Sequence, residues 1–303
     1  MPEHPSGQQF QLKHGEHDAV ITEVGAGIRS YSSGGVAVLD GFGVDQMCDG
    51  ARGQSLLPWP NRIADGTYAW AQQSQQLPLT EPDKHNAIHG LTRWANWELL
   101  ELTDTSVHLR HHLRSQPGWP FLLRCDIRYS LGECGLTVRT TARNTGPEAC
   151  PFAAGAHPYL SAGAGVIDDC ELVVPGDTWL PTDQRGIPTG TVPVDGTTHD
   201  FRQPRAIGQL HIDQSYTDLR RDPEGRATVD LRRADGTGAQ LWAGPGYPYL
   251  EIFTGDTLAP ARRRRGLGVE PMTAPPNAFQ TGTDLAVLQP GETVELSWGL
   301  RPL

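Results

Sequence analysis

Residues 127–141 read IRYSLGECGLTVRTT, in which two alternating apolar and polar runs flank a turn bounded by Gly132 and Gly135. Alternation with a period of two is typical of a strand with one buried face, and a short glycine-bounded connection between two such runs predicts an antiparallel hairpin. Residues 107–113, VHLRHHL, alternate in the same way, so we expect their basic side chains to form a solvated face. This part of the chain therefore predicts an antiparallel sheet.

The composition extends the prediction to all 303 residues. Gly (35) and Pro (25) are frequent, which indicates many tight turns between short strands. Near the C-terminus, residues 286–298 contain the turn Gln289-Pro290-Gly291, and we expect a hairpin-like ending there. No internal repeat, Gly/Ser linker or composition break divides the sequence. We therefore expect one all-β domain of antiparallel strands that spans residues 1–303.

Charge and cysteine usage narrow the partners and the compartment. The formal net charge of −10 argues against nucleic acid and against an anionic membrane surface as partners. The five cysteines are odd in number and include no CxxC pair, which favours a reducing compartment over a disulfide framework. The N-terminus lacks the pattern of a signal peptide, and no apolar run is long enough to span a bilayer. We expect a cytoplasmic protein.

The common motifs of cofactor and metal chemistry do not occur. The sequence contains no GxGxxG, P-loop, GxSxG or zinc-ligand spacing, which argues against dinucleotides, nucleoside triphosphates, a serine nucleophile and zinc. His85 and His89 are four residues apart, but this spacing joins two imidazoles on one metal ion only within a helix. No helical periodicity surrounds them. We therefore expect no metal site.

Two stretches each deliver one titratable side chain that is followed at once by a proline. Residues 268–279, GVEPMTAPPNAF, carry Glu270, and residues 151–160, PFAAGAHPYL, carry His157. A residue before proline is biased toward an extended backbone, and the surrounding prolines make the segment rigid at little cost in ordering entropy. Tyr159 shares a strand face with His157. The ordinary alternatives are a surface glutamate at a strand end and a structural histidine in a turn.

Further polar residues lie on stiffened segments or apolar faces. Asn61 and Arg62 follow Pro58 and Pro60, and an arginine held there would present a planar fork of donors to a hydroxylated ligand. The alternative is a surface arginine that bonds its own loop. Further candidates are His89, before Gly90; Asp213, beside Ile212; and Glu251, which shares a strand face with Tyr249 and Phe253. Such a set suits acid/base chemistry on a polyhydroxylated substrate.

In six short motifs, in the right order from about residue 53 onward, the chain resembles the aldose 1-epimerases, or galactose mutarotases. The motifs are Asn61-Arg62-Ile63-x2-Gly66, Asn86-x2-His89-Gly90, His157-Pro158-Tyr159, Ile212-Asp213-x2-Tyr216, Thr254-Gly255 and Glu270-Pro271. The resemblance implies a large antiparallel β-sandwich of the supersandwich kind, with a hexose on one open sheet face. It implies no cofactor and either a monomer or a homodimer.

The resemblance also implies roles for the candidate residues. Glu270 would be the general base at the C1 hydroxyl of the sugar, and His157 the general acid at the ring oxygen. His89 would hydrogen-bond near the ring oxygen as a further catalytic residue. Ring hydroxyls would be bound by Asn61, Arg62 and Asp213, and Tyr159 would line the site.

Two departures from the family pattern keep alternatives open. Many members carry Gln where this chain has Glu251, and an added carboxylate among the substrate-binding residues would alter the selectivity for hydroxyls. The run Arg262-Arg263-Arg264-Arg265 is either a solvated loop tip or a site that neutralises a phosphate. A hexose-6-phosphate 1-epimerase and a non-catalytic sugar-binding protein of the same fold are therefore the alternative functions.

Overall fold

Two large sheets contain most of the strands in the computed structural model, which describes residues 3–303. The predicted domain boundary at residue 1 lies outside the described residues. The first sheet has nine strands, in the order β10 (Glu98–Leu102), β11 (Ser106–Leu113), β12 (Leu123–Gly132), β13 (Gly135–Asn144), β27 (Thr293–Pro302), β23 (Gly238–Ala243), β22 (Ala227–Arg232), β17 (Glu171–Val173) and β20 (Arg205–Ala206).

The second sheet has eight strands. Their order is β19 (Val192–Pro193), β18 (Gly176–Leu180), β21 (Asp213–Leu219), β24 (Tyr249–Phe253), β25 (Gly266–Met272), β15 (Gly155–Ala156) and β5 (Ser55–Leu56), with β16 (Tyr159–Ser161) also paired to β25. The pairings in both large sheets are antiparallel, which confirms the predicted all-β antiparallel class.

Smaller elements complete the fold. The small sheets are β1 (Gln9–His14), β2 (His17–Thr22), β3 (Ile28–Ser33) and β4 (Val36–Ala37); β6 (Arg62–Ala64) with β9 (Asn86–Ile88); β7 (Thr67–Trp70) with β8 (Gln73–Gln76); and β14 (Cys150–Phe152) with β26 (Ala286–Leu288). The helical pieces in the described residues are the 3-10 turns η1 (Pro82–Lys84) and η2 (Ile167–Asp169) and the short helix α1 (Ala278–Thr281). None of these helical pieces is long and apolar enough to cross a membrane.

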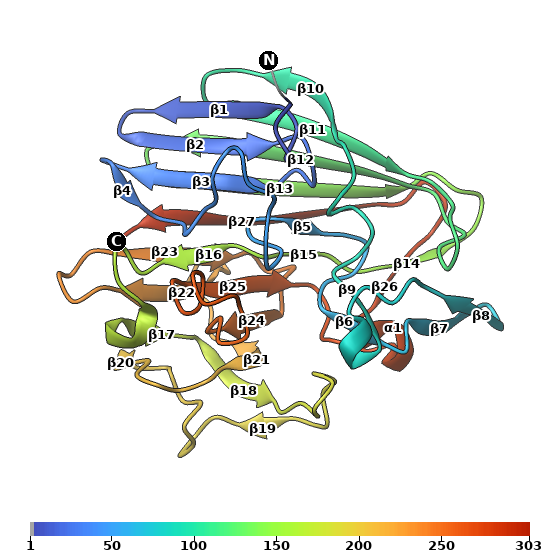
Figure 1. Ribbon diagram of the computed structural model, residues 1–303. Helices are drawn as coiled ribbons and strands as arrows, with labels where there is room; N and C mark the ends of the chain where they lie inside the picture. The colour runs from blue at the N-terminus through green and yellow to red at the C-terminus, as the bar shows by residue number, and fades with distance from the viewer. Residues whose placement is uncertain (1–2) are drawn as a thin grey trace.

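The sheets stack as a sandwich around one large apolar core, beside which Leu180, Tyr249 and Met272 form a small second cluster. Figure 1 shows β1–β3 lying across β11–β13, while β16 and β25 lie over the β22–β23 side of the same sheet. Leu109 and Tyr129 of the nine-stranded sheet, and Leu12 and Ile21 of the small sheet above it, are fully buried between the layers. Burial of alternate side chains against a second layer is what the alternating sequence predicted.

The predicted hairpin at residues 127–141 is confirmed, since β12 and β13 pair up to Gly132 opposite Gly135. The predicted C-terminal hairpin is wrong. The turn at Gln289-Pro290-Gly291 is present, but β26 pairs with β14 and β27 pairs with β13 and β23. A local turn signal does not determine the pairing when each of the two strands has another partner available in a separate sheet.

Candidate active site

A row of polar side chains crosses the eight-stranded sheet. The register places Ser215 of β21 opposite Glu251 of β24, and Glu251 opposite Glu270 of β25. Directly opposed residues on antiparallel strands project from the same face of the sheet. His157 lies in the two-residue gap between β15 and β16, both of which pair with β25, so it falls beside Glu270. We call Ser215, Glu251, Glu270 and His157 the polar row.

The backbone of His157 is fixed between two neighbouring strands. Its N–H donates to the carbonyl of Gln54 over 3.0 Å, and its own carbonyl accepts from the N–H of Gly53 over 2.8 Å. Pro158 has no N–H to donate and thereby interrupts the strand, but its carbonyl accepts from Val269 over 3.0 Å. The proline predicted from sequence to keep His157 extended therefore also separates β15 from β16 and leaves the imidazole on the open face.

His157 and Glu270 are in direct contact in the interior. Nε2 of His157 lies 3.1 Å from Oε1 of Glu270, and the two residues are 5% and 2% exposed. Burial, followed by Arg52 and Arg93, lowers the pKa of His157 to about 3. Burial, followed by Glu251 and Asp213, raises the pKa of Glu270 well above its ordinary range. Both shifts favour the uncharged forms of the two side chains.

The ring of His157 is held in a stack. Tyr159 lies parallel to it, with ring centroids 4.9 Å apart and an interplanar angle of 10°. On the Tyr159 ring lies the guanidinium of Arg52, at 4.0 Å from the centroid, and the Tyr159 hydroxyl donates to the carbonyl of Gly50 over 2.9 Å. Arg52 is in turn paired with Asp40 over 2.6 Å. The stack fixes the imidazole plane and brings a positive charge near it, which disfavours the imidazolium.

His89 is held by the segment that carries Asn61. Its N–H donates to the carbonyl of Asn61 over 2.9 Å, and the N–H of Asn61 donates to Nδ1 of His89 over 3.2 Å. A neutral imidazole that accepts at Nδ1 carries its proton at Nε2. Burial, followed by His157, lowers the pKa of His89 well below its ordinary value. His89 is therefore a fixed neutral donor, and its ring forms a T-shaped pair with that of His157 at 5.2 Å between centroids.

Arg62 is fixed by an acidic partner that the sequence did not indicate. Its Nε and Nη2 atoms donate to the two carboxylate oxygens of Glu81 over 2.9 and 3.0 Å, and Nη2 lies 3.9 Å from Asp213. This two-point contact holds the guanidinium plane in one orientation. The alternative of a surface arginine that bonds its own loop is therefore wrong.

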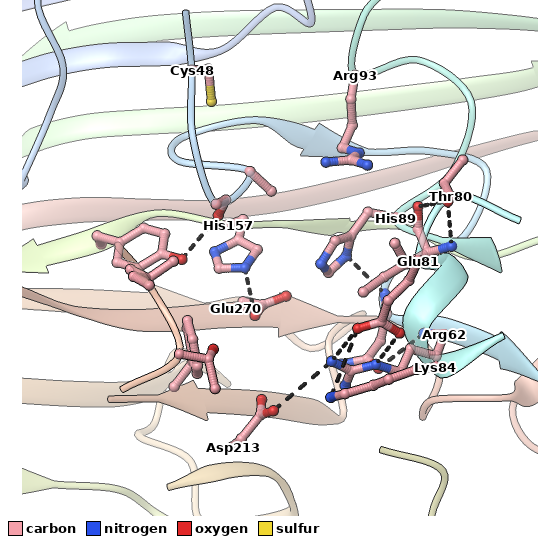
Figure 2. Close-up of a pocket in the computed structure, with 18 of the residues that line it drawn as sticks. Cys48, Arg62, Thr80, Glu81, Lys84, His89, Arg93, His157, Asp213 and Glu270 are labelled. Carbon is pink, nitrogen blue, oxygen red and sulfur yellow. Dashed lines mark hydrogen bonds and ion pairs between the residues drawn. The ribbon is translucent and has the colours of Figure 1, made fainter. Parts of the chain in front are cut away.

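These side chains surround one pocket of about 430 Å³, a size that suits a small-molecule site. Figure 2 shows His157 above Glu270, His89 beside them, and Asp213 and Arg62 on the opposite side of Glu270 from the imidazoles. The predicted site residues that line the pocket are Asn61, Arg62, His89, His157, Tyr159, Asp213 and Glu270. The sequence motifs, which span more than 200 residues, thus converge in space.

Glu251 is the predicted site residue that does not line the pocket. Its side chain is 3% exposed, and its Oε2 accepts a hydrogen bond from the hydroxyl of Ser215. The sequence analysis missed several of the lining residues, among them Glu81, Arg93 and Trp94. Glu81 belongs to no motif. An exposed Trp directly after an Arg, close to the His89-Gly90 motif, was a signal that could have been used.

The structure also answers two further sequence hypotheses. His85 does not approach His89, because it is largely exposed and contacts Asp65 over 2.9 Å. Arg262 pairs with Asp40 at 3.6 Å, and Arg264 pairs with Asp168 and Asp256 at 2.6 and 2.8 Å. None of the four consecutive arginines lines the pocket, so the alternative of a phosphate-neutralising site at this run has no support.

His89, His157 and Glu270 are close enough together to be considered as a metal site. One potential ligand atom from each lies within 4.8 Å of the others. His89 does not fit this role, however, because a metal at Nε2 would require that nitrogen to lose its proton while Nδ1 still accepts from the backbone of Asn61. The donor set matches proton transfer better than metal binding.

Comparison with solved structures defines the class of the fold. The GalM/aldose epimerase homologue from C. elegans superimposes with a TM-score of 0.87 at 15% identity, and the match covers 98% of each chain. The galactose 1-epimerase from Lactobacillus acidophilus NCFM gives a TM-score of 0.79 at 18% identity, over 97% of this chain and 93% of that one. The fold is therefore that of the galactose mutarotase-like β-sandwiches.

Sequence comparison gives the family. The aldose 1-epimerase family model matches residues 8–301, and the chain belongs to this family of isomerases. It is 34% identical over 305 residues to the uncharacterized protein YihR of Escherichia coli (strain K12). This match covers 98% of this chain and 94% of that protein. It is 29% identical to the galactose mutarotase of Mus musculus, over 77% of this chain and 73% of that protein.

Proposed function

We propose that the protein interconverts the α and β anomers of a free hexose. The observation that carries the proposal is the His157–Glu270 pair, whose Nε2 and Oε1 atoms lie 3.1 Å apart at the wall of the pocket. Opening a pyranose ring requires that one proton leave the C1 hydroxyl and that one reach the ring oxygen. An imidazole and a carboxyl group side by side supply both transfers.

Glu270 is the base and His157 is the acid in this mechanism. Transfer of the carboxyl proton from Glu270 to the neutral His157 creates a carboxylate and an imidazolium without changing the total charge. Glu270 then takes the C1 hydroxyl proton, the bond between C1 and the ring oxygen breaks, and the imidazolium protonates that oxygen. The aldehyde rotates about C1–C2, and reversal of both transfers closes the ring on its other face. Both groups end as they began.

The remaining residues orient the sugar. His89 donates from Nε2 toward the ring oxygen, and its fixed tautomer supports His157, not His89, as the acid. Ring hydroxyls are bound by Asn61, Arg62 and Asp213, and Tyr159 keeps the His157 ring in place. The indole of Trp94, which is 53% exposed at the pocket, offers an apolar surface to the C–H face of a pyranose.

Polarimetry on freshly dissolved α-D-glucose and α-D-galactose tests the proposal. We expect the optical rotation to relax to equilibrium faster than in buffer alone, in proportion to protein concentration. The ratio of kcat/KM for the two sugars then defines the preferred hexose. Binding detected by calorimetry without any acceleration would instead support the non-catalytic sugar-binding alternative, and neither binding nor acceleration would contradict the proposal for free hexoses.

A specific observation favours a second candidate, a hexose-6-phosphate 1-epimerase. Arg93 lines the pocket, no carboxylate among residues 3–303 pairs with it, and its buried Nε has no hydrogen-bond partner. Figure 2 shows its guanidinium on the side of the histidines that faces away from Glu270 and Asp213. If C1 lies at Glu270 and the ring oxygen at the histidines, the C6 substituent lies toward Arg93. A phosphate there would supply the missing counter-charge.

The substitution Arg93→Gln separates the two candidates. For a phosphorylated substrate we expect kcat/KM on glucose 6-phosphate to fall by about 10²-fold, as for loss of a charged contact, with little change on free glucose. Arg263→Gln, which changes an arginine outside the pocket, is the control for both substrates. Equal activity of the Arg93 variant and the wild type on glucose 6-phosphate would remove this candidate.

The proposal also includes the architecture and location of the protein. We propose one domain of residues 1–303, present as a monomer or a homodimer in the cytoplasm. The large apolar core supports the single domain, and the five cysteines without a disulfide support the cytoplasmic location. Limited proteolysis, light scattering and cell fractionation test these three statements in turn.

A further inference from the structure

Glu251 occupies a place for which neither stability nor substrate binding gives a reason. It is buried behind the pocket wall, directly opposite Glu270 on the neighbouring strand. Like charges directly opposite each other on neighbouring strands destabilise a sheet, and burial increases the effect. A glutamine would fill the same space and accept the same hydrogen bond from Ser215 without this cost. The carboxyl group of Glu251, which adds a negative charge beside Glu270 whenever it is ionised, is therefore the feature that requires an explanation.

The other groups that face Glu270 do not neutralise this charge. His157 contacts Glu270 from the β15–β16 gap and is neutral, and His89 is neutral for the reasons given above. Asp213 of β21 adds a second negative charge. The cation that acts on Glu270 is Arg62 of β6, which is bound at two points by Glu81. The hydroxyl of Tyr159 donates to a backbone carbonyl, away from the carboxyl groups.

The polar row positions the Glu251 carboxyl group. The strand register sets its Cα opposite that of Glu270, and the Ser215 hydroxyl, which is itself buried, donates to Oε2. Donation of this kind favours the ionised carboxylate. Burial, followed by Asp213, acts in the opposite direction and raises the pKa of Glu251 to about 8. Two carboxyl groups so placed lose their protons in two separate steps that belong to the pair.

We propose that Glu251 is a positioning residue for the reaction, fixed by Ser215 behind Glu270, and that its carboxyl group keeps Glu270 able to accept a proton near neutral pH. This inference rests on the proposed function of the site. Glu251 acts through Glu270 and does not touch the sugar. A base that must take up and return a proton in each cycle works best when its affinity for protons matches the working pH. Arg62 acts on Glu251 as well as on Glu270, but it is bound at two points by Glu81, and no salt bridge among residues 3–303 joins Glu251 to a cation. The adjacent carboxyl group therefore provides that match.

The substitution Glu251→Gln tests the charge while keeping the shape. If Glu251 raises the proton affinity of Glu270, the acid limb of kcat/KM against pH moves to lower pH by about one unit or more. Ser215→Ala removes the donor that favours the ionised form of Glu251. A smaller shift of the acid limb, also to lower pH, is therefore expected. Glu133→Gln, in the exposed turn between β12 and β13, is the control, and its pH profile is expected to match the wild type.

Two outcomes would overturn the inference. One is an unchanged acid limb in a folded Glu251→Gln protein. The other is a rise in KM without any shift of the limb, which would mean that Glu251 binds the sugar directly. Circular dichroism and thermal unfolding of each variant establish that it is folded before its profile is compared.

A titration that does not depend on activity separates this inference from the proposed function. In protein labelled with ¹³C at the glutamate carboxyl carbons, we expect Glu270 and Glu251 to titrate in two steps, both above the ordinary range of glutamate. In Glu251→Gln, Glu270 is expected to titrate in one step at lower pH, and Glu270→Gln serves for assignment. An unchanged Glu270 titration would overturn the inference, whatever sugar the enzyme acts on. Absence of activity on every sugar, with the shift present, would overturn only the proposed function.

Discussion

Two buried carboxyl groups, one in each large sheet, have opposite surroundings. Asp126 of β12 lies directly opposite Arg110 of β11, and its oxygens contact Arg110, Arg124 and His108 at 2.6, 3.1 and 3.0 Å. Glu270 of β25 lies directly opposite a second carboxyl group, that of Glu251. The same antiparallel geometry thus produces an ion pair in one sheet and, in the other, a pair of facing carboxyl groups that carry like charges when both are ionised.

The difference teaches where the fold is built for stability and where it is built for chemistry. Around Asp126, half-buried basic side chains replace the solvation that the carboxylate loses, although the sequence predicted a solvated face there. Around Glu270 the compensation is incomplete, and one of its oxygens is buried without a hydrogen-bond partner. Uncompensated titratable groups in a pocket are typical of sites that move protons. Four substitutions test the comparison.

The largest effect is expected for Glu270→Gln. Loss of the base should lower kcat by about 10²–10⁴-fold, the range for general acid/base groups, while the folded state is kept because a repulsive contact is removed. Polarimetric rates on the preferred hexose measure the effect, with Glu133→Gln as the exposed control. A Glu270→Gln protein with wild-type kcat would show that the like-charge pair is not catalytic.

The next largest effect is expected for His157→Asn. The amide keeps part of the polarity but cannot carry a proton to the ring oxygen, so kcat should fall by about 10²-fold or more. Replacement of the stacked neighbour, Tyr159→Phe, keeps the ring and should lower kcat much less. The two variants are compared by kcat and KM measured separately. Equal losses would mean that the stack as a whole, and not the imidazole proton, limits the rate.

Asp126→Asn should affect stability instead of activity. His108, Arg110 and Arg124 then contact a neutral amide in place of a carboxylate. Loss of charge-assisted contacts of this kind costs about 2–3 kcal/mol in the free energy of unfolding. Urea denaturation measures the change, while kcat per folded molecule should stay at the wild-type value. The exposed pair Arg139–Glu295, at 3.5 Å, provides the control, and Glu295→Gln should change stability little. A large loss of kcat in Asp126→Asn would contradict the assignment of Asp126 to stability and of Glu270 to catalysis.

The smallest effect is expected for the stability of Glu251→Gln, which should be a gain where Asp126→Asn shows a loss. The pKa of Glu251 in the folded protein is raised to about 8, so above the pKa of the unfolded chain the unfolded state releases this proton first and is favoured. The wild type therefore loses this part of its stability as the pH rises toward 8, and the Gln variant lacks this contribution to the pH dependence. A gain in the free energy of unfolding that is clearly larger at pH 8 than at pH 4 is the expected result of urea denaturation at the two values. A gain that did not depend on pH would contradict the assignment of this group.

Local patterns in the sequence determined the β class, the hairpin of β12 and β13, and the candidate catalytic pair. Alternation fixes which face of a strand is apolar, and X-Pro steps bias the backbone at His157 and Glu270, so these features follow from neighbouring residues alone. Seven of the eight predicted site residues line the pocket, because each belongs to a motif that resembles the family. The roles of these residues stay predictions until the variants are measured.

Tertiary structure alone decided how the motifs meet. The strand register that sets Ser215, Glu251 and Glu270 in one row depends on pairings between residues 36 and 19 positions apart, which no local pattern encodes. For the same reason the partner of Arg62 was found only in the folded chain, and Glu251 proved to lie behind the pocket. Proton affinity depends on burial and on the charges nearby, and both come into existence only when distant segments pack together.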